Sequence, residues 1–259
     1  MEKRRFVKQA PKSEDRNAEN IVFGTRAVIE TIKSGKTIEK IFLQKDLKNE
    51  LTQELTSLLR GSMVSVSKVP VEKLNRITQK NHQGVVAYVS PIDFVSLHNI
   101  VASSYENGLA PLVLILDQIT DIRNFGAICR SAECAGVNGI VIPSKGGAMI
   151  NADAVKTSAG ALSYLPICKE SSLTHSIKYL KDSGFQIVAC TEKTEDSIYS
   201  ADLTTPTAII MGAEDTGISD ELLEAADHKC KIPLTGQIES LNVSVATGIV
   251  LFESLRQRS

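Results

Sequence analysis

The amino-acid sequence predicts an α/β fold built on a mostly parallel sheet. Strand patterns alternate with amphipathic helix patterns along most of the 259 residues, which is the order that crossover helices and parallel strands produce. Several strand segments are apolar throughout, which indicates that helices bury both faces of the sheet. The length of the chain predicts one large or two smaller domains, with enough residues for a sizeable core.

The first elements predict a small α/β domain at residues 20–91. Before it, residues 1–19 are polar and charged, and we expect a flexible basic arm there. Pro70 suits the first turn of a short helix. Periodicity predicts helices at 24–33, 47–59 and 70–77, and strands at 38–43, 63–66 and 84–90. A unit of this size is plausible as a separate domain.

A second domain is predicted at residues 110–259, after a linker or lid at residues 92–109. A final helix opens near Ser240, which suits an N-cap by residue type. Parallel strands place their carboxyl-end loops on one edge, where ligands usually bind, and here those loops are rich in polar and small residues. The expected strands are 112–116, 139–142, 186–190 and 208–211, and the expected helices are 124–135 and 173–181.

The charge of the chain is unevenly distributed. Residues 1–95 carry 17 Lys and Arg against 11 Asp and Glu, whereas residues 96–259 carry 12 against 19. A basic first part joined to an acidic second part indicates that the first part faces an anionic partner such as nucleic acid. The alternative, that these charges belong to an ordinary solvated surface with no anionic partner, is compatible with the same composition.

Several classes of protein are not supported by the sequence. No apolar run reaches the length of a membrane span, and the basic N-terminus lacks the apolar stretch of a secretory signal. The five cysteines form no CxxC pair, which suggests reduced thiols in a cytoplasmic protein. The histidines are scattered, so we expect no metal site. Ser34-Gly35-Lys36-Thr37 ends like a P-loop, but Glu30 stands where that loop requires glycine.

Three segments of the second part each follow an apolar stretch and combine polar with small residues. They are Asn124-Phe-Gly126-Ala-Ile-Cys-Arg130-Ser-Ala132, Met211-Gly212-Ala213-Glu214-Asp215-Thr-Gly217, and Ile232-Pro233-Leu-Thr-Gly236 with Ser240-Leu241-Asn242-Val243-Ser244. In this order they resemble the three motifs of the SpoU (TrmH) branch of the SPOUT methyltransferases. The N-terminal part, with Gly24-Thr-Arg26-Ala-Val28 and Asn81-His82-Gln83-Gly84, is similar to the small substrate-binding domain of that family, whose fold is shared with a ribosomal protein.

The resemblance implies a fold, a cofactor and an assembly. The second domain would be a parallel-sheet domain with a trefoil knot at its C-terminal end, a rare topology that periodicity does not reveal. The cofactor would be S-adenosylmethionine, and family members are homodimers with an active site near the subunit interface. By motif match the cofactor-binding residues would be Thr191, Gly212, Ile232 and Leu241. Glycine suits close backbone approach to a ligand, and the two apolar side chains suit the walls of an adenine site.

The same resemblance implies the catalytic residues, which are Asn124, Arg130, Glu214, Ser240 and Asn242. The family assigns the arginine to the target hydroxyl or its phosphate, and sometimes to proton removal. We favour phosphate binding, because a guanidinium stays protonated up to about pH 12 and is a poor base. Asn124 would orient Arg130 or the RNA, and Glu214 would orient its own loop or hold Arg130. Ser240 and Asn242 would complete the pocket.

The expected function is S-adenosylmethionine-dependent methylation of a ribose 2′-hydroxyl of RNA. The tail from Asn242 and the two-domain layout are most similar to bacterial large-subunit rRNA guanosine 2′-O-methyltransferases, which makes rRNA the expected substrate. Two alternatives stay open: a tRNA ribose methyltransferase, and a non-catalytic RNA-binding protein for ribosome assembly. Aromatic residues make up only 5% of the chain, so recognition is expected to depend on phosphates and RNA shape more than on base stacking.

Overall fold

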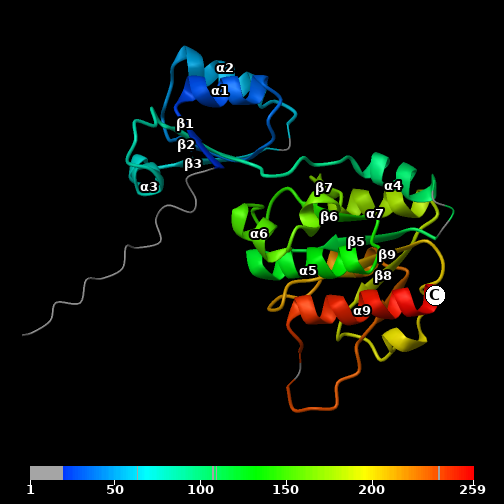
Figure 1. Ribbon diagram of the computed structural model, residues 1–259. Helices are drawn as coiled ribbons and strands as arrows, with labels where there is room; N and C mark the ends of the chain where they lie inside the picture. Colours follow the sequence, from blue (N-terminus) through cyan, green and yellow to red (C-terminus); the bar gives the residue numbers. More distant parts are fainter. Residues whose placement is uncertain (1–19, 63, 107, 109, 239) are drawn as a thin grey trace, which may run out of the picture.

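The computed structural model describes residues 20–62, 64–106, 108, 110–238 and 240–259. These residues form two α/β units joined by a single connecting segment (Figure 1). The basic arm expected at residues 1–19 lies outside the described residues. None of the helices in the described part of the chain combines the length and hydrophobicity that crossing a bilayer demands.

The N-terminal unit is a four-stranded sheet with helices on both faces. Its strand order is β1-β4-β2-β3, with β2 and β3 parallel and β4 antiparallel to β1 and β2. Successive residues of β2 face opposite cores: Ile41 packs with α1 and α2, and Phe42 packs with α3. The strands are β1 Ile21–Phe23, β2 Ile38–Gln44, β3 Ser65–Val69 and β4 Val85–Val89, and the helices are α1 Thr25–Lys33, α2 Glu50–Leu58 and α3 Val71–Ile77.

The C-terminal unit is a parallel six-stranded sheet in the order β10-β8-β9-β5-β6-β7, which confirms the predicted fold class. Its strands are β5 Leu112–Leu116, β6 Gly139–Pro143, β7 Ile167–Glu170, β8 Gln186–Cys190, β9 Thr207–Met211 and β10 His228–Cys230. The central strand β5 is buried along its whole length, as its unbroken apolar sequence predicts.

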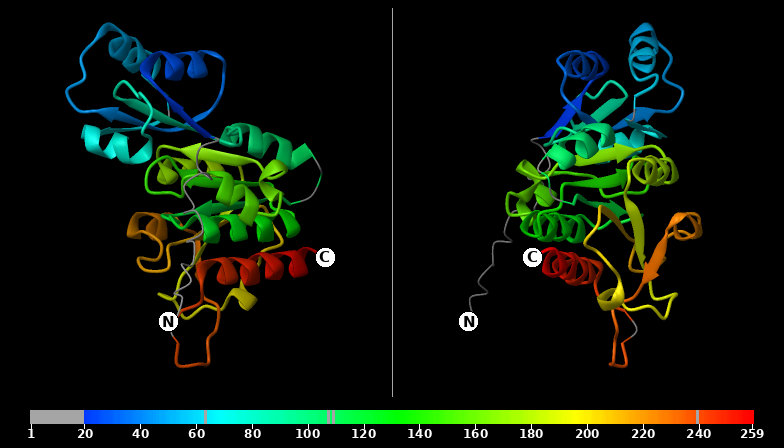
Figure 2. Two further views of the ribbon diagram at one scale, coloured as in Figure 1. Left: turned by 60° about the vertical axis from the view of Figure 1, so that its left-hand side comes forward. Right: turned by 90° about the vertical axis from the view of Figure 1, so that its right-hand side faces the viewer.

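Helices cover both faces of this sheet. One face carries α5 Ile122–Cys134, α6 Ala152–Thr157 and α9 Val243–Arg258, and the other carries α4 Leu97–Glu106, α7 Leu173–Asp182 and α8 Asp220–Ala225. Two 3₁₀ turns, η2 Ala161–Ser163 and η3 Ile198–Ser200, complete the unit. Figure 2 shows α9 running alongside α5 beneath the sheet. Close packing of α5 depends on Gly126, where a Cβ would lie 2.7 Å from the Thr157 Cβ atom.

Two expectations about elements need correction. The stretch 92–109, which the sequence pattern presents as a linker or lid, contains α4, whose buried side chains join the core beneath α7: Leu97, Ile100 and Val101. The last helix begins at Val243, not near Ser240. Asn242 is its N-cap, because the Asn242 side-chain oxygen accepts a hydrogen bond from the Ser244 amide at 3.0 Å.

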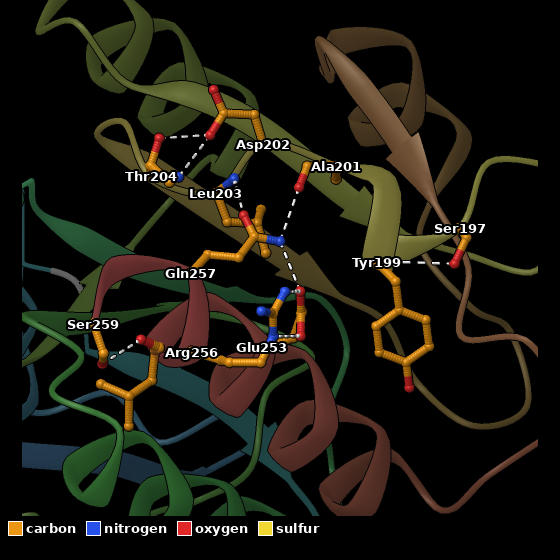
Figure 3. Close-up of polar contacts among 11 residues, drawn as sticks. Ser197, Tyr199, Ala201, Asp202, Leu203, Thr204, Glu253, Arg256, Gln257 and Ser259 are labelled. Atoms are coloured by element: carbon orange, nitrogen blue, oxygen red, sulfur yellow. Dashed lines mark hydrogen bonds and ion pairs between the residues drawn. The ribbon is translucent and has the colours of Figure 1, made fainter.

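The C-terminal end of α9 is fastened to the segment before β9 (Figure 3). The Gln257 amide nitrogen donates to the Ala201 carbonyl at 3.0 Å, and its oxygen accepts from the Leu203 amide at 2.8 Å. Glu253 accepts from Arg256 and Gln257, each at 2.8 Å. These hydrogen bonds, led by those from Arg256, lower the pKa of Glu253 to about 2. Ionised Glu253 therefore helps to hold the last turn of the chain in place.

Replacement of Glu253 by Gln should therefore remove a pH-dependent part of the stability. The pKa of Glu253 falls from 4.5 to about 2 on folding, so its contribution is complete above about pH 5 and is lost as the pH falls toward 2. We expect Glu253→Gln to lower the free energy of unfolding by about 1–2 kcal/mol at pH 7, with the difference shrinking below pH 4.5 in urea titrations. Glu133→Gln, at an exposed position of α5, is the control. A difference independent of pH would exclude this role.

Candidate active site

A cavity of about 720 Å³ opens at the carboxyl ends of β8, β9 and β10, the sheet edge that the polar loops indicated. Four segments line it: residues 190–193, 211–217, 231–234, and Ser240, Leu241, Val243 and Ala246 from the start of α9 and the residues before it. The walls combine apolar side chains with polar loop residues, which is the usual composition of a small-molecule site.

All four residues expected to bind a cofactor line this cavity: Thr191, Gly212, Ile232 and Leu241. Thr191 is 6% exposed. Its amide donates to the Cys230 carbonyl at 2.9 Å, which ties the loop after β8 to the end of β10. The Thr191 hydroxyl accepts from the Lys193 amide at 3.2 Å. The residues expected to bind a cofactor therefore come together from the ends of β8, β9 and β10 and from the segment before α9.

Gly212 is required by its own loop. A Cβ at residue 212 would lie 2.2 Å from the carbonyl carbon of Gly217 and 2.3 Å from the Ile218 nitrogen, far inside van der Waals contact. The loop 212–217 folds back on itself, and the Gly217 amide donates to the Ala213 carbonyl at 2.9 Å. The close backbone approach inferred from the sequence is thus an approach within the loop, which shapes the wall of the cavity.

The three motif segments meet at the carboxylate of Glu214. Its Oε1 atom accepts from the Asn124 side-chain amide at 3.1 Å, from the Asn242 side-chain amide, and from the Val243 backbone amide at 3.0 Å. The Asn242 amide also donates to Asn124 Oδ1 at 3.0 Å. A carboxylate at the N-terminus of α9 is favoured, because the helix has unpaired N–H groups and a positive dipole end there. Glu214 therefore joins α5, the loop after β9 and α9.

These contacts revise the roles that the sequence suggested. Glu214 holds Asn124 and the first turn of α9, and among the described residues no hydrogen bond joins it to Arg130. Asn124 and Asn242 do not line the cavity, whereas Glu214 and Ser240 do. Both asparagine side chains are occupied in fixing helix positions, since Asn242 caps α9. The two asparagines support the site from outside its wall.

Arg130 lies apart from the cavity. It is exposed on α5 and does not line the cavity of its own chain. Motif residues beside it serve packing, because Phe125 is 1% exposed and Gly126 contacts α6 closely. The structure thus brings together eight of the nine expected residues around one sheet edge and its supporting helices. The ninth, Arg130, lies on the exposed surface of α5, outside the cavity.

Sequence reasoning missed two supports of the cavity. Asp117 directly follows β5 and is 5% exposed. Its Oδ2 atom accepts from the Ser219 amide at 2.8 Å, which anchors the residues after the 212–217 loop. The thiols of Cys190 and Cys230 lie 3.6 Å apart on paired strands, and their mutual contact and burial raise the pKa of Cys190. A carboxylate directly after an apolar strand was the available signal for Asp117, while nothing in the cysteine spacing indicated the thiol pair.

Comparisons with known proteins identify the family. The model of the SpoU rRNA methylase family matches residues 111–252, and a model for RNA 2′-O ribose methyltransferase substrate binding matches residues 21–95. A protein of Staphylococcus saprophyticus named as a TrmH family tRNA/rRNA methyltransferase is 33% identical over 241 residues, which cover 93% of this chain and 97% of that protein.

Solved structures agree with this assignment. An AdoMet-bound rRNA methyltransferase from Sinorhizobium meliloti has a TM-score of 0.59 at 25% identity, over 92% of this chain and 87% of that chain. The TrmH/SpoU tRNA modifying enzyme of A. aeolicus has a TM-score of 0.53 at 33% identity, over 62% of this chain and 84% of that chain. With both of its domains matched and full-length relatives above 30% identity, the chain belongs to the SpoU family of RNA 2′-O-ribose methyltransferases.

Proposed function

We propose that the protein transfers a methyl group from S-adenosylmethionine to the 2′-hydroxyl of a guanosine ribose in large-subunit rRNA. The observation that carries the proposal is the convergence of the three motif segments at one cavity, with Glu214 joining them. The solved relative with AdoMet bound supports the cofactor. The substrate-binding match over residues 21–95 supports RNA as the substrate, and an rRNA substrate implies the cytoplasm as the compartment.

The cavity fits the proposed cofactor by size and chemistry. Its volume of about 720 Å³ lies within the usual range for small-molecule sites. Ile232 and Leu241 would enclose an adenine, and the folded-back loop of residues 212–217 would form another wall of its site. When bound, S-adenosylmethionine supplies an electrophilic methyl group on a sulfonium. The carboxylates of Glu192, Glu214 and Asp215 line the cavity together with the ammonium groups of Lys193 and Lys231. Each ammonium is paired with a carboxylate outside the lining, Asp220 or Glu195, so the lining carboxylates leave an excess of negative charge that suits a sulfonium cation.

The residues of the chain would then align a ribose with the methyl group. Transfer requires the 2′-oxygen about 3–3.5 Å from the methyl carbon and in line with it. Glu214 fixes the first turn of α9, so Ser240 and Leu241 have a defined place at the cavity wall. We assign Arg130 to the phosphate beside the target ribose, where a permanent cation holds the substrate and stabilises developing negative charge. In this family's knotted topology, which we also propose here, α9 closes the site.

A homodimer would bring Arg130 to a cavity. Exposed apolar side chains lie on α9 at positions compatible with a second copy of the chain: Val245 at 51%, Phe252 at 48% and Leu255 at 36% exposure. Because α5 packs against α9, an interface over α9 would place the partner subunit's Arg130 close to the joined surfaces. We therefore propose that the site is completed across a homodimer interface.

A tRNA substrate is the second candidate. The Staphylococcus saprophyticus relative is named for both tRNA and rRNA, and the A. aeolicus enzyme is named as a tRNA modifying enzyme. The family assignment argues against a non-catalytic assembly factor. The two RNA classes are therefore the alternatives that the following experiment separates.

Methyl transfer should occur on ribose and depend on Arg130. With labelled S-adenosylmethionine we expect label in large-subunit rRNA and little in bulk tRNA, and Arg130→Ala should reduce the rate about 100-fold or more. Cofactor affinity, measured by calorimetry, should not change, because Arg130 lies outside the cavity. Arg130→Lys keeps the charge and should retain part of the rate. Label in tRNA alone would show that tRNA, and not rRNA, is the substrate. A fully active Arg130→Ala variant would exclude Arg130 from the mechanism.

Gly212→Ala should weaken S-adenosylmethionine binding at least about tenfold, because the added Cβ collides with the backbone of residues 217 and 218 and displaces the loop. Gly248→Ala is the matched control: its nearest neighbour would be Ser131 Oγ at 3.8 Å, an ordinary contact, and the residue does not line the cavity. Calorimetry with each variant, alongside urea unfolding, tests this. Equal affinities for the two variants would mean that the 212–217 loop does not bind the cofactor.

A charge placed among the exposed apolar side chains of α9 should prevent dimer formation. We expect wild type to sediment as a dimer, and Val245→Glu and Phe252→Glu to sediment as monomers, because an interface would bury the new carboxylate without a partner. Tyr164→Glu controls for a charge at an exposed aromatic residue elsewhere, since Tyr164 is 80% exposed. A monomeric wild type would refute the homodimer, and dimeric variants would place the interface on another surface.

A further inference from the structure

An ion pair is buried between the two α/β units. Glu39, on β2 of the N-terminal sheet, accepts from the Lys169 ammonium on β7 of the C-terminal sheet at 2.8 Å. The two side chains are only 5% and 9% exposed. The same ammonium lies 4.8 Å from the ring centroid of Phe94, in the chain that connects the units. The other five ion pairs in the described residues are far more exposed on at least one partner and join residues within one unit.

The connecting chain is fixed at the same place. The Val95 amide donates to the Ile167 carbonyl at 2.9 Å, so this segment is held against β7 at the edge of the sheet. On the other side, the Ser90 amide donates to the Thr37 carbonyl at 2.8 Å, and the Thr37 hydroxyl donates to Asp93 at 2.9 Å. The ion pair thus lies inside a joint whose backbone is held by both units.

The buried pair specifies geometry more than it adds stability. Burial of two charges costs hydration free energy that their attraction only about offsets, so an apolar pair of similar size would stabilise the joint as well. One carboxylate oxygen of Glu39, Oε2, is buried without a hydrogen-bond partner in the described structure. The Glu39 carboxylate therefore depends on the single hydrogen bond that its other oxygen, Oε1, accepts from Lys169. Movement at the joint that broke this bond would leave a buried charge with no partner, which is costly.

The joint and the cavity are at opposite sides of the C-terminal sheet. β7 is one edge strand, while the cavity lies at the ends of β8, β9 and β10, the last of which is the other edge strand. Figure 1 shows β7 beside the N-terminal unit and the segment leading into α9 at the far end of the molecule. A small rotation at the joint would therefore move RNA bound by the N-terminal unit through a larger distance relative to a cavity.

From this geometry we propose that the Glu39–Lys169 ion pair is a positioning element that sets the orientation of the RNA-binding unit for methyl transfer. The proposal rests on the function proposed above. RNA held by the N-terminal unit presents its ribose in line only when the joint is locked, whereas cofactor binding needs only the C-terminal unit. Both residues act through the joint, so loss of the pair should affect use of RNA and leave the cavity intact.

The first test measures the joint without relying on activity. Phe94 is covered by the Lys169 ammonium and flanked by the Val95 hydrogen bond, so chymotrypsin can cut after Phe94 only when the joint opens. We expect Glu39→Gln to raise that cleavage at least about fivefold, as measured from fragments 1–94 and 95–259 by mass spectrometry. Lys169→Met should raise the cleavage further. In Glu39→Gln the Lys169 ammonium still lies over the Phe94 ring, whereas in Lys169→Met that contact is lost and the Glu39 carboxylate has no partner. Glu54→Gln, which breaks the exposed pair with Lys33, is the control and should not change cleavage.

The second test uses methyl transfer to a large-subunit rRNA fragment. We expect Glu39→Gln to lower kcat/KM about 10-fold or more, mainly through KM, with calorimetric affinity for S-adenosylmethionine within about twofold of wild type. The decisive variant combines Glu39→Leu with Lys169→Met, which should recover stability but not KM. Recovery of both by the apolar pair would make the ion pair merely structural and overturn the proposal, as would unchanged cleavage after Phe94. A wild type inactive on both RNAs would refute the proposed function, and the cleavage assay would still decide whether the ion pair locks the joint.

Discussion

The carboxylate of Glu214 is the contact on which the cavity depends. It lies at the positive end of the α9 dipole and accepts hydrogen bonds from α5, from the cap of α9 and from the Val243 amide. Without a carboxylate there, two helices and a loop from distant parts of the sequence would lose their common partner. The walls contributed by Leu241 and by the 212–217 loop have defined positions because this junction and the end of α9 are both fastened.

The residues of this site divide into those that form the wall and those that hold it. Thr191, Ile232 and Leu241 line the cavity, whereas Asn124 and Asn242 hydrogen-bond to one another and to Glu214, and Asn242 also caps α9. A polar residue in a motif can therefore serve the chemistry without touching the substrate. Gly212 shows the same point for backbone, because the glycine is needed for the loop to fold back on itself.

The sequence predicted the parallel sheet well, because fully buried strands such as β5 leave an unbroken apolar signal. It failed for short elements whose stability comes from tertiary packing: α4 was interpreted as a linker, and β1, β7, β10, α6 and α8 were not predicted. The cavity walls followed from motif order. The N-cap was misplaced because Ser240 and Asn242 have similar capping propensity, and only the position of Glu214 decides between them. No local pattern could reveal the Glu39–Lys169 contact, which joins residues 130 positions apart.

Cofactor and substrate place different demands on this chain. A small cofactor needs only short loops at adjacent strand ends, and one chain supplies them around a single open cavity. An RNA substrate spans distances larger than a domain. In our proposal its placement depends on how rigidly the N-terminal unit is joined at β7 and, in the proposed dimer, on Arg130 of the partner subunit. Because phosphate and shape recognition requires correct spacing more than a particular motif, the sequence specifies the chemistry sharply and the RNA weakly.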